Sequence, residues 1–193
     1  RSRRQRQMCI RDSINAPKEQ LLSIRGNIVS MVFQEPMTSL NPYHKVGNQI
    51  TESILLHSSS SKKEATKEAM DLMSLVEIDD VERRFHSYPH ELSGGQRQRI
   101  MIAIALVNKP ELLIADEPTT ALDVTIQAQI LDLMSKLKSE LGMSILFITH
   151  DLGLVKEFSD KVCVMKDGEI VEQGNTNNVF ENPAHPYTKK LLD

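Results

Sequence analysis

The run Leu92-Ser93-Gly94-Gly95-Gln96 combines residue types that suit the binding of a phosphate at the start of a helix. Ser93 would cap a helix over residues 96–107, and glycines would let bare backbone N–H groups approach the phosphate. Taken alone, these five residues also fit a plain turn before a buried helix. The alternating glutamines and arginines over residues 96–99, and an acidic strand end further along the chain, favour phosphate binding.

Two acids, Asp116 and Glu117, follow an apolar run over residues 112–115. Carboxylates at the end of a buried strand are costly unless something uses their charge. Asp116 is suited to coordinating Mg²⁺ through water, and Glu117 to polarising an attacking water as a general base. Pro118 makes an acid pair at a helix start an equally good reading of these two residues.

Three further polar residues stand where strands end or helices begin. Asp123 precedes a helix and is expected to cap it, whatever else it does. His150 directly follows a strand, where a histidine is more often structural, although a neutral imidazole could donate to a phosphate oxygen. Gln34 ends an earlier strand and offers a donor and an acceptor to a metal or water, although alone it would mean nothing.

The spacing of apolar residues indicates short strands that alternate with helices, and these elements must position the site residues. This alternation predicts an α/β fold with a mostly parallel sheet. Parallel sheets bind ligands at the carboxyl ends of their strands, where Gln34, Asp116 and His150 fall. We expect buried strands at residues 28–33, 112–115 and 144–148, helices at 46–57, 96–107, 126–141 and 152–158, a hairpin around Asp167-Gly168, and a short helix after Pro183.

A helical insertion is expected between the first two strands. Ser61 and Glu64 have the spacing of a capping box, and apolar residues follow at helical intervals. The insertion begins near residue 45, and together with the helix at 96–107 it forms a helical subdomain over residues 45–107.

The composition is that of an ordinary globular protein, with 40% hydrophobic and 25% charged residues. The net charge of -3 gives no electrostatic reason to expect nucleic acid as a partner. The two cysteines form no motif, and no apolar run approaches the ~20 residues that span a bilayer. Any link to a membrane is therefore expected to run through a partner.

The first thirteen residues differ from the rest, because five arginines crowd a polar stretch without apolar periodicity. A basic arm or a targeting peptide is one interpretation, and a non-native leader over residues 1–13 is the one we favour. The domain itself is then expected over residues 14–193.

In this order the motifs resemble the nucleotide-binding domain of the ATP-binding cassette (ABC) superfamily. The resemblance spans about residues 24–193: Gln34 matches the glutamine loop, residues 92–96 the signature motif, 112–117 the Walker B strand, 121–123 the D-loop and His150 the switch histidine. Residues 33–42 and 182–188 resemble the oligopeptide, dipeptide and nickel importer branch. The implied fold is an ABC-type, P-loop NTPase-like α/β domain with a helical subdomain.

The resemblance implies ATP and Mg²⁺ as cofactors of a transport-coupled ATPase. Glu117 would be the catalytic base, Asp116 and Gln34 would support the metal, and His150 and Gln34 would sense the γ-phosphate. The residues that would contact the nucleotide of a second nucleotide-binding subunit, across a head-to-tail dimer, are Ser93, Gly94, Gly95, Gln96 and Asp123.

The implied partners are that second subunit, transmembrane permease subunits and, indirectly, a periplasmic or extracellular solute-binding protein. The protein would then sit peripherally on the cytoplasmic face of a bacterial membrane and power import of peptides or a related small solute. The loop over residues 36–41 would form part of the groove that receives the permease.

One expected element is missing from the sequence: it contains no phosphate-cradling G-x-x-x-x-G-K-[ST] loop. We therefore expect an incomplete nucleotide-binding domain, and no ATP hydrolysis by the 193-residue chain alone. Two alternatives stay open. One is a catalytically deficient subunit that only completes a partner's ATP site; the other is a soluble, non-transport ABC ATPase.

Overall fold

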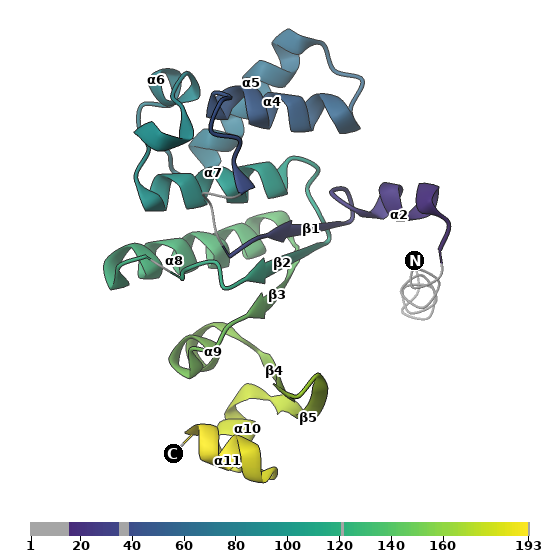
Figure 1. Ribbon diagram of the computed structural model, residues 1–193, viewed down its shortest axis with the longest axis vertical. Helices are drawn as coiled ribbons and strands as arrows, with labels where there is room; N and C mark the ends of the chain where they lie inside the picture. Colours follow the sequence, from purple (N-terminus) through teal and green to yellow (C-terminus); the bar gives the residue numbers. More distant parts are fainter. Residues whose placement is uncertain (1–15, 35–38, 121, 193) are drawn as a thin grey trace. The chain divides into compact units, whose positions relative to one another are not determined.

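The computed structural model describes residues 16–34, 39–120 and 122–192. The predicted leader over residues 1–13, the first half of the loop over residues 36–41, and Ala121 of the D-loop lie outside these ranges. The chain forms two compact units, with the boundary between Leu146 and Phe147 (Figure 1). Among the described residues no helix is both long and apolar enough to cross a membrane.

The first unit is built on parallel strands, as predicted. β1 (Val29–Val32) pairs with β2 (Leu112–Asp116), and β3 (Ser144–Ile148) begins on the other side of β2, so the strand order is β1-β2-β3. The register places Val32 opposite Ala115. Both of these side chains are buried, as is Leu113 in the middle of β2. The residues that follow β1 and β2 therefore emerge together at the carboxyl edge of the sheet.

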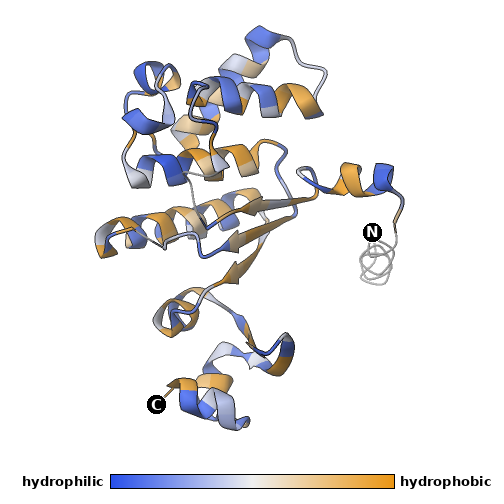
Figure 2. Ribbon diagram, viewed as in Figure 1, coloured by the Kyte–Doolittle hydropathy of each residue, from blue (hydrophilic) through white to orange (hydrophobic). Residues whose placement is uncertain are grey.

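Helix α7 (Gly94–Leu106) packs on β1, and α8 (Val124–Leu141) packs on α7. The prediction that α7 is buried is confirmed, because its apolar residues from Ile100 to Leu106 are almost all buried. Figure 2 shows hydrophobic stretches along α7, α8 and the strands of this unit. The core of α8 is one stripe with helical spacing, made of Ile130, Leu133, Met134 and Leu137.

The helical insertion lies between β1 and β2 in sequence, as predicted. It contains α4 (Val46–His57), α5 (Lys62–Leu75), α6 (Val81–Phe85) and a short 3₁₀ helix, η1 (Pro89–Glu91). In Figure 1, α7 lies between these helices and β1, and it contacts α4, α5 and β1. Ser61 and Glu64 form the predicted capping box at the start of α5. A short helix before the first strand, α2 (Lys18–Ile24), was not predicted.

The predicted strands differ from the structure in burial more than in position. β3 has the predicted bounds, but its side chains are not buried: Leu146 is 50% and Ile148 44% exposed. β3 lies at one edge of the described three-stranded sheet, and no described helix packs extensively on it. β1 is buried on one face only, since Met31 and Phe33 are exposed.

The second unit holds α9 (Leu152–Phe158), β4 (Lys161–Lys166), β5 (Glu169–Asn175), α10 (Thr176–Glu181) and α11 (Pro186–Leu192). β4 and β5 form the predicted antiparallel hairpin. Its turn residues Asp167 and Gly168 both have positive φ, as the favoured two-residue hairpin turn requires. The final helix begins at Pro186, after the predicted Pro183, and α10 was not predicted.

Candidate functional site

Glu117 lies at the centre of the polar cluster at the carboxyl edge of the sheet. Its Oε2 accepts a hydrogen bond from Gln34 Nε2 at 2.8 Å. The strand register explains this contact. Val32 pairs with Ala115, and Gln34 and Glu117 follow these two paired residues by the same number of positions. The end of β1 and the acidic end of β2 are therefore joined directly by their side chains.

Two more features bear on the conformation of Glu117. Its φ of 45° lies in the left-handed region, which residues with a Cβ rarely adopt outside functional sites and tight turns. The same Oε2 also accepts a hydrogen bond from Thr120 Oγ1 at 2.9 Å. The carboxylate is thus held in one orientation by donors from two different loops.

Asp116 is the last residue of β2 and is only partly exposed. The described residues contain no group of three His, Cys, Asp or Glu side chains that could hold a metal ion by themselves. Mg²⁺ commonly uses one or two carboxylates and takes its other ligands from water and substrate phosphates. Asp116, Glu117 and the amide oxygen of Gln34, all oxygen donors at one sheet edge, suit that mode of binding.

The start of α7 is built as its sequence predicts. Ser93 Oγ accepts the N–H of Gln96 at 3.2 Å, and Gln96 Oε1 accepts the N–H of Ser93 at 3.1 Å. The helix begins at Gly94 and not at Gln96, because this capping box encloses both glycines. Ser93 and Gly94 are exposed. First-turn N–H groups have no partner inside the helix, so those of Gly94 and Gly95 can serve a ligand.

The two glycines also pack against the segment that carries Asp123. A Cβ on Gly95 would lie 2.7 Å from Cγ2 of Ile126, and one on Gly94 would lie 3.3 Å from Cδ2 of Leu122. Asp123 caps α8, as predicted, by accepting the N–H of Ile126 at 2.9 Å on Oδ1. The exposed starts of α7 and α8 therefore form one packed surface.

His150 lies between β3 and α9 in the second unit, and its side chain is exposed. The neighbouring turn is ordered locally, since Asp151 N donates to Thr149 Oγ1 and Asp151 Oδ1 caps α9. His150 and Glu117 belong to different units, so the expected proximity of these two residues stays a prediction.

Two polar arrangements were not predicted from the sequence. In the first unit, Glu77 accepts from Arg99 at 2.9 Å and from Lys136 at 3.0 Å, which links the end of α5 to α7 and α8. In the second unit, the Glu172 carboxylate accepts the backbone N–H groups of Ala184 at 2.8 Å and His185 at 3.0 Å. Neither could be found from local spacing, because the partners lie far apart in the sequence.

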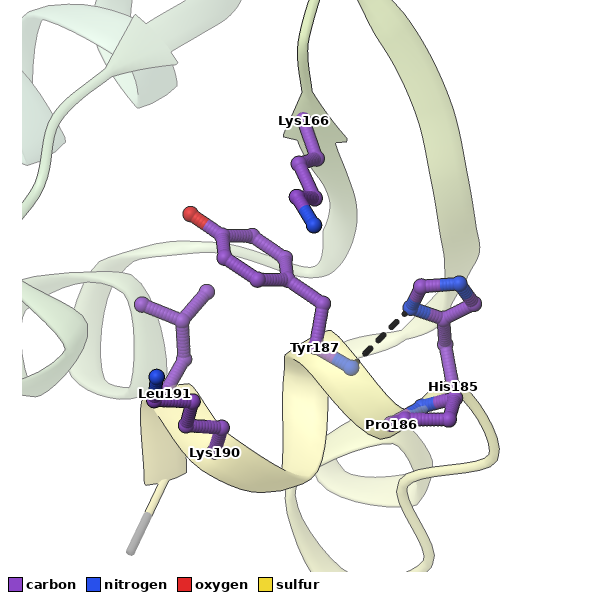
Figure 3. A pocket seen from close by; sticks show the side chains of 6 residues that line it. All are labelled: Lys166, His185, Pro186, Tyr187, Lys190 and Leu191. Atoms are coloured by element: carbon purple, nitrogen blue, oxygen red, sulfur yellow. Dashed lines mark hydrogen bonds between the residues drawn. The ribbon is translucent and has the colours of Figure 1, made fainter.

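A shallow, open pocket of about 530 Å³ lies in the second unit, where α11 faces the hairpin (Figure 3). Lys166 Nζ is 5.2 Å from the centre of the Tyr187 ring, a cation–π distance. Tyr187 N donates to His185 Nδ1 at 3.1 Å. The pocket contains none of the predicted site residues; it is lined by Lys166, His185, Pro186, Tyr187, Lys190 and Leu191.

Comparison with known families gives two matches. The ABC transporter family model matches residues 6–120, which is more than half of the chain. The chain therefore belongs to the ABC transporter ATP-binding family. Its last residues, 171–193, match the C-terminal region of oligopeptide and dipeptide transporters, so it belongs to that branch of the family. The pocket of Figure 3 and the Glu172 contacts lie mostly within this second match.

Curated relatives agree with this assignment. A putative peptide import ATP-binding protein of Brucella melitensis is 59% identical over 91% of this chain and 52% of its own length. A dipeptide transport ATP-binding protein of Lactococcus lactis is 54% identical over 95% of this chain and 53% of its own. A peptidoglycan transport ATP-binding protein of Agrobacterium fabrum is 56% identical over 94% of this chain, which corresponds to 33% of that relative. The chain thus spans between a third and about half of these relatives.

Solved structures confirm the predicted cassette fold. A dimeric ATP-binding cassette in a post-hydrolysis state, bound to ADP and Pi, has a TM-score of 0.72 at 30% identity; the match covers 84% of this chain and 68% of that one. CbiO1 of Clostridium perfringens, part of an ABC transporter complex, has a TM-score of 0.75 at 30% identity and covers 86% of this chain and 64% of its own.

Proposed function

We propose that the protein containing this chain is the ATP-hydrolysing subunit of an ABC importer for peptides or a related small solute. The hydrogen bond between Gln34 and Glu117 carries this proposal, because it joins the end of β1 to the acidic end of β2 in a fold that the solved cassettes share. The similarity to a dipeptide transport protein and the oligopeptide/dipeptide C-terminal match support a peptide substrate.

Glu117 is the general base in this proposal. A base must accept a proton from water at hydrogen-bond distance, and the two donors on Oε2 fix the direction of the carboxylate. Asp116 and Gln34 would hold Mg²⁺, which neutralises charge on the phosphates when it is bound. His150 would contact the γ-phosphate, where negative charge develops.

The exposed start of α7 acts on a second subunit's nucleotide in this proposal. Ser93 and Gln96 form the capping box, and the backbone N–H groups of Gly94 and Gly95, which the box does not use, lie at the positive end of an α-helix and suit an anionic ligand supplied by another chain. Asp123 caps α8 on the same surface. A dimeric relative bound to ADP and Pi supports a two-subunit arrangement.

The proposed partners are a second nucleotide-binding subunit, transmembrane permease subunits and, through them, a solute-binding protein. In this proposal, binding to the permease places the protein at the cytoplasmic face of a bacterial membrane.

Reconstitution tests the proposal. The full-length protein would be placed with its permease in vesicles, with ATP inside and the solute-binding protein outside, and uptake of labelled dipeptides, tetrapeptides and Ni²⁺ would be measured together with phosphate release. We expect peptide uptake coupled to ATP hydrolysis. Hydrolysis without uptake of any solute would favour a non-transport ATPase. Phosphate release that Glu117→Gln in this subunit leaves unchanged, and that therefore arises only at the partner's ATP site, would favour the half-site alternative.

A further inference from the structure

We propose that Thr120 is a positioning residue that holds the carboxylate of Glu117 in the orientation needed for its role as a base. The inference rests on the proposed function, in which Glu117 activates water. Thr120 is exposed and lies one turn beyond Glu117, separated from it by the buried residues Pro118 and Thr119. It needs no contact with the nucleotide to affect the reaction.

Thr120 makes hydrogen bonds to both the backbone and the side chain of Glu117. Thr120 N donates to the backbone oxygen of Glu117 at 3.1 Å, which closes a tight turn. Thr120 Oγ1 donates to Glu117 Oε2 at 2.9 Å. The backbone bond is available to any residue except proline, whereas the side-chain bond requires a hydroxyl at this position.

The backbone conformation of Glu117 explains why a hydrogen bond to its side chain matters. Glu117 has a φ of 45°, a conformation that is unfavourable for a residue with a Cβ and that persists only where the surroundings enforce it. A long glutamate side chain on such a backbone has several rotamers available. The Thr120 hydroxyl selects the rotamer in which Oε2 also accepts from Gln34 at 2.8 Å.

Two donors from separate loops thus converge on one oxygen. Gln34 follows β1 and Thr120 follows β2, so their bonds reach Oε2 from different segments of the chain. Of these two donors, Thr120 is the one that a short turn ties to Glu117. We therefore infer that Thr120 is the residue that keeps the Glu117 carboxylate in this orientation.

Replacement of the hydroxyl tests this assignment in the full-length protein. Thr120→Val keeps the size and branching but removes the donor, and Thr120→Ser keeps the donor. Thr66→Val is the matched control, because Thr66 Oγ1 donates to Lys62 O at 2.8 Å on the exposed face of α5, away from the site. For each protein, kcat and KM for ATP would be measured, and also in a Glu117→Gln background.

We expect Thr120→Val to lower kcat by about tenfold to a hundredfold with KM nearly unchanged, the size of effect that a misplaced reacting group produces. Thr120→Ser and Thr66→Val should stay close to wild type. In the Glu117→Gln background, Thr120→Val should cause no further loss, because Thr120 acts through that carboxylate. A normal kcat for Thr120→Val, an equal loss in Thr120→Ser, or additive losses in the double variant would each overturn the proposal.

Nucleotide-free crystal structures of the wild type and the two Thr120 variants give a readout that does not depend on activity. The bond from Gln34 Nε2 to Glu117 Oε2 should persist in Thr120→Ser and break in Thr120→Val, and its persistence in both would overturn the proposal. If the wild type hydrolyses no ATP, the proposed function fails, whereas these structures still decide whether Thr120 orients Glu117.

Discussion

The Cβ that Gly95 lacks would lie 2.7 Å from Cγ2 of Ile126, closer than non-bonded carbon atoms can approach. Gly95 is buried in the first turn of α7, and Ile126 lies in the first turn of α8. A glycine here therefore has a packing function in addition to any function in binding phosphate. The clash cannot be relieved by a simple rotation, because Cγ2 is attached directly to the Cβ of a β-branched side chain.

Gly95→Ala should destabilise the full-length protein by about 1–3 kcal/mol through overpacking, offset by roughly 1 kcal/mol from the better helix propensity of alanine. Ile126→Ala makes room, so the double variant should be more stable than the sum of the two single effects predicts. Chemical denaturation measures this cycle. Gly94→Ala is the control, since its Cβ would meet only the flexible end of Leu122 at 3.3 Å. Additive effects at Gly95 and Ile126 would contradict the packing explanation.

Glu117→Gln should reduce ATP turnover of the full-length protein by about two to four orders of magnitude, the usual contribution of a positioned base. ATP affinity should survive, because glutamine has nearly the same shape and lacks only the charge. Steady-state phosphate release and equilibrium ATP binding, measured on the same preparation, check both parts. Near-normal turnover would show that another residue activates the water.

The ion pairs of Glu77 should make stability depend on pH. Hydrogen bonds from Arg99 and then Lys136 lower the pKa of the Glu77 carboxyl from its ordinary value of 4.5, while burial works weakly in the opposite direction. Because the pKa is lower in the folded state, the stabilisation is complete above pH 4.5 and is lost as the pH falls through the lowered value.

Glu77→Gln should cost about 1 kcal/mol at neutral pH, because Glu77 is half-exposed whereas Arg99 is mostly buried. Denaturation of the full-length protein over a range of pH is the measurement. The difference from wild type should shrink once the pH is below the ordinary value of 4.5. Glu82→Gln, on the neighbouring α6, is the control. A difference independent of pH would mean that the ion pairs contribute nothing.

Glu172 should hold the start of α11 in place. The Thr188 hydroxyl and the backbone N–H groups of Ala184 and His185 lower the pKa of the Glu172 carboxyl. The two N–H groups make hydrogen bonds by distance and angle, whereas the buried Thr188 hydroxyl only lies close by. Glu172→Ala removes the acceptor from both N–H groups, so the backbone amides of α11 should exchange with solvent hydrogen faster.

Hydrogen exchange detected by mass spectrometry measures this effect, with Glu169→Ala on the same strand as the control. The wild type should approach the exchange rate of Glu172→Ala as the pH falls through the lowered pKa, once each rate is corrected for intrinsic exchange. Equal protection of α11 in wild type and Glu172→Ala at neutral pH would remove Glu172 from this role.

The features predicted correctly from the sequence depend on neighbouring residues. The capping box of Ser61 and Glu64, the cap of Asp123 on α8 and the positive-φ turn at Gly168 all follow from spacings of one to three residues. Helices α4 and α9 and strand β3 have the predicted bounds. The short helix α6 was missed because five residues carry too little periodicity to be recognised.

The features that could not be predicted depend on contacts between distant segments. Gln34 has no local signal for its bond to Glu117, because the strand register brings these atoms together. The bond from Thr120 is local, but it accompanies a positive φ at Glu117 that the sequence does not indicate. Glu77 and Glu172 resemble ordinary surface acids in the sequence. The buried character expected of β3 was wrong because an apolar run indicates a strand without showing which elements cover it.

Because β1 pairs directly with β2, the geometry of the site does not depend on the length of the chain that connects these two strands. The whole helical insertion lies between these strands, yet the distance from Gln34 to Glu117 is set by the hydrogen bonds of the sheet. Residues added to or deleted from the connection between α4 and α5 would therefore leave this contact intact. A slip of one residue in β1 would turn the side chain at position 34 to the other face of the sheet. Evolution can thus reshape the surface of the insertion without disturbing the chemistry beneath it.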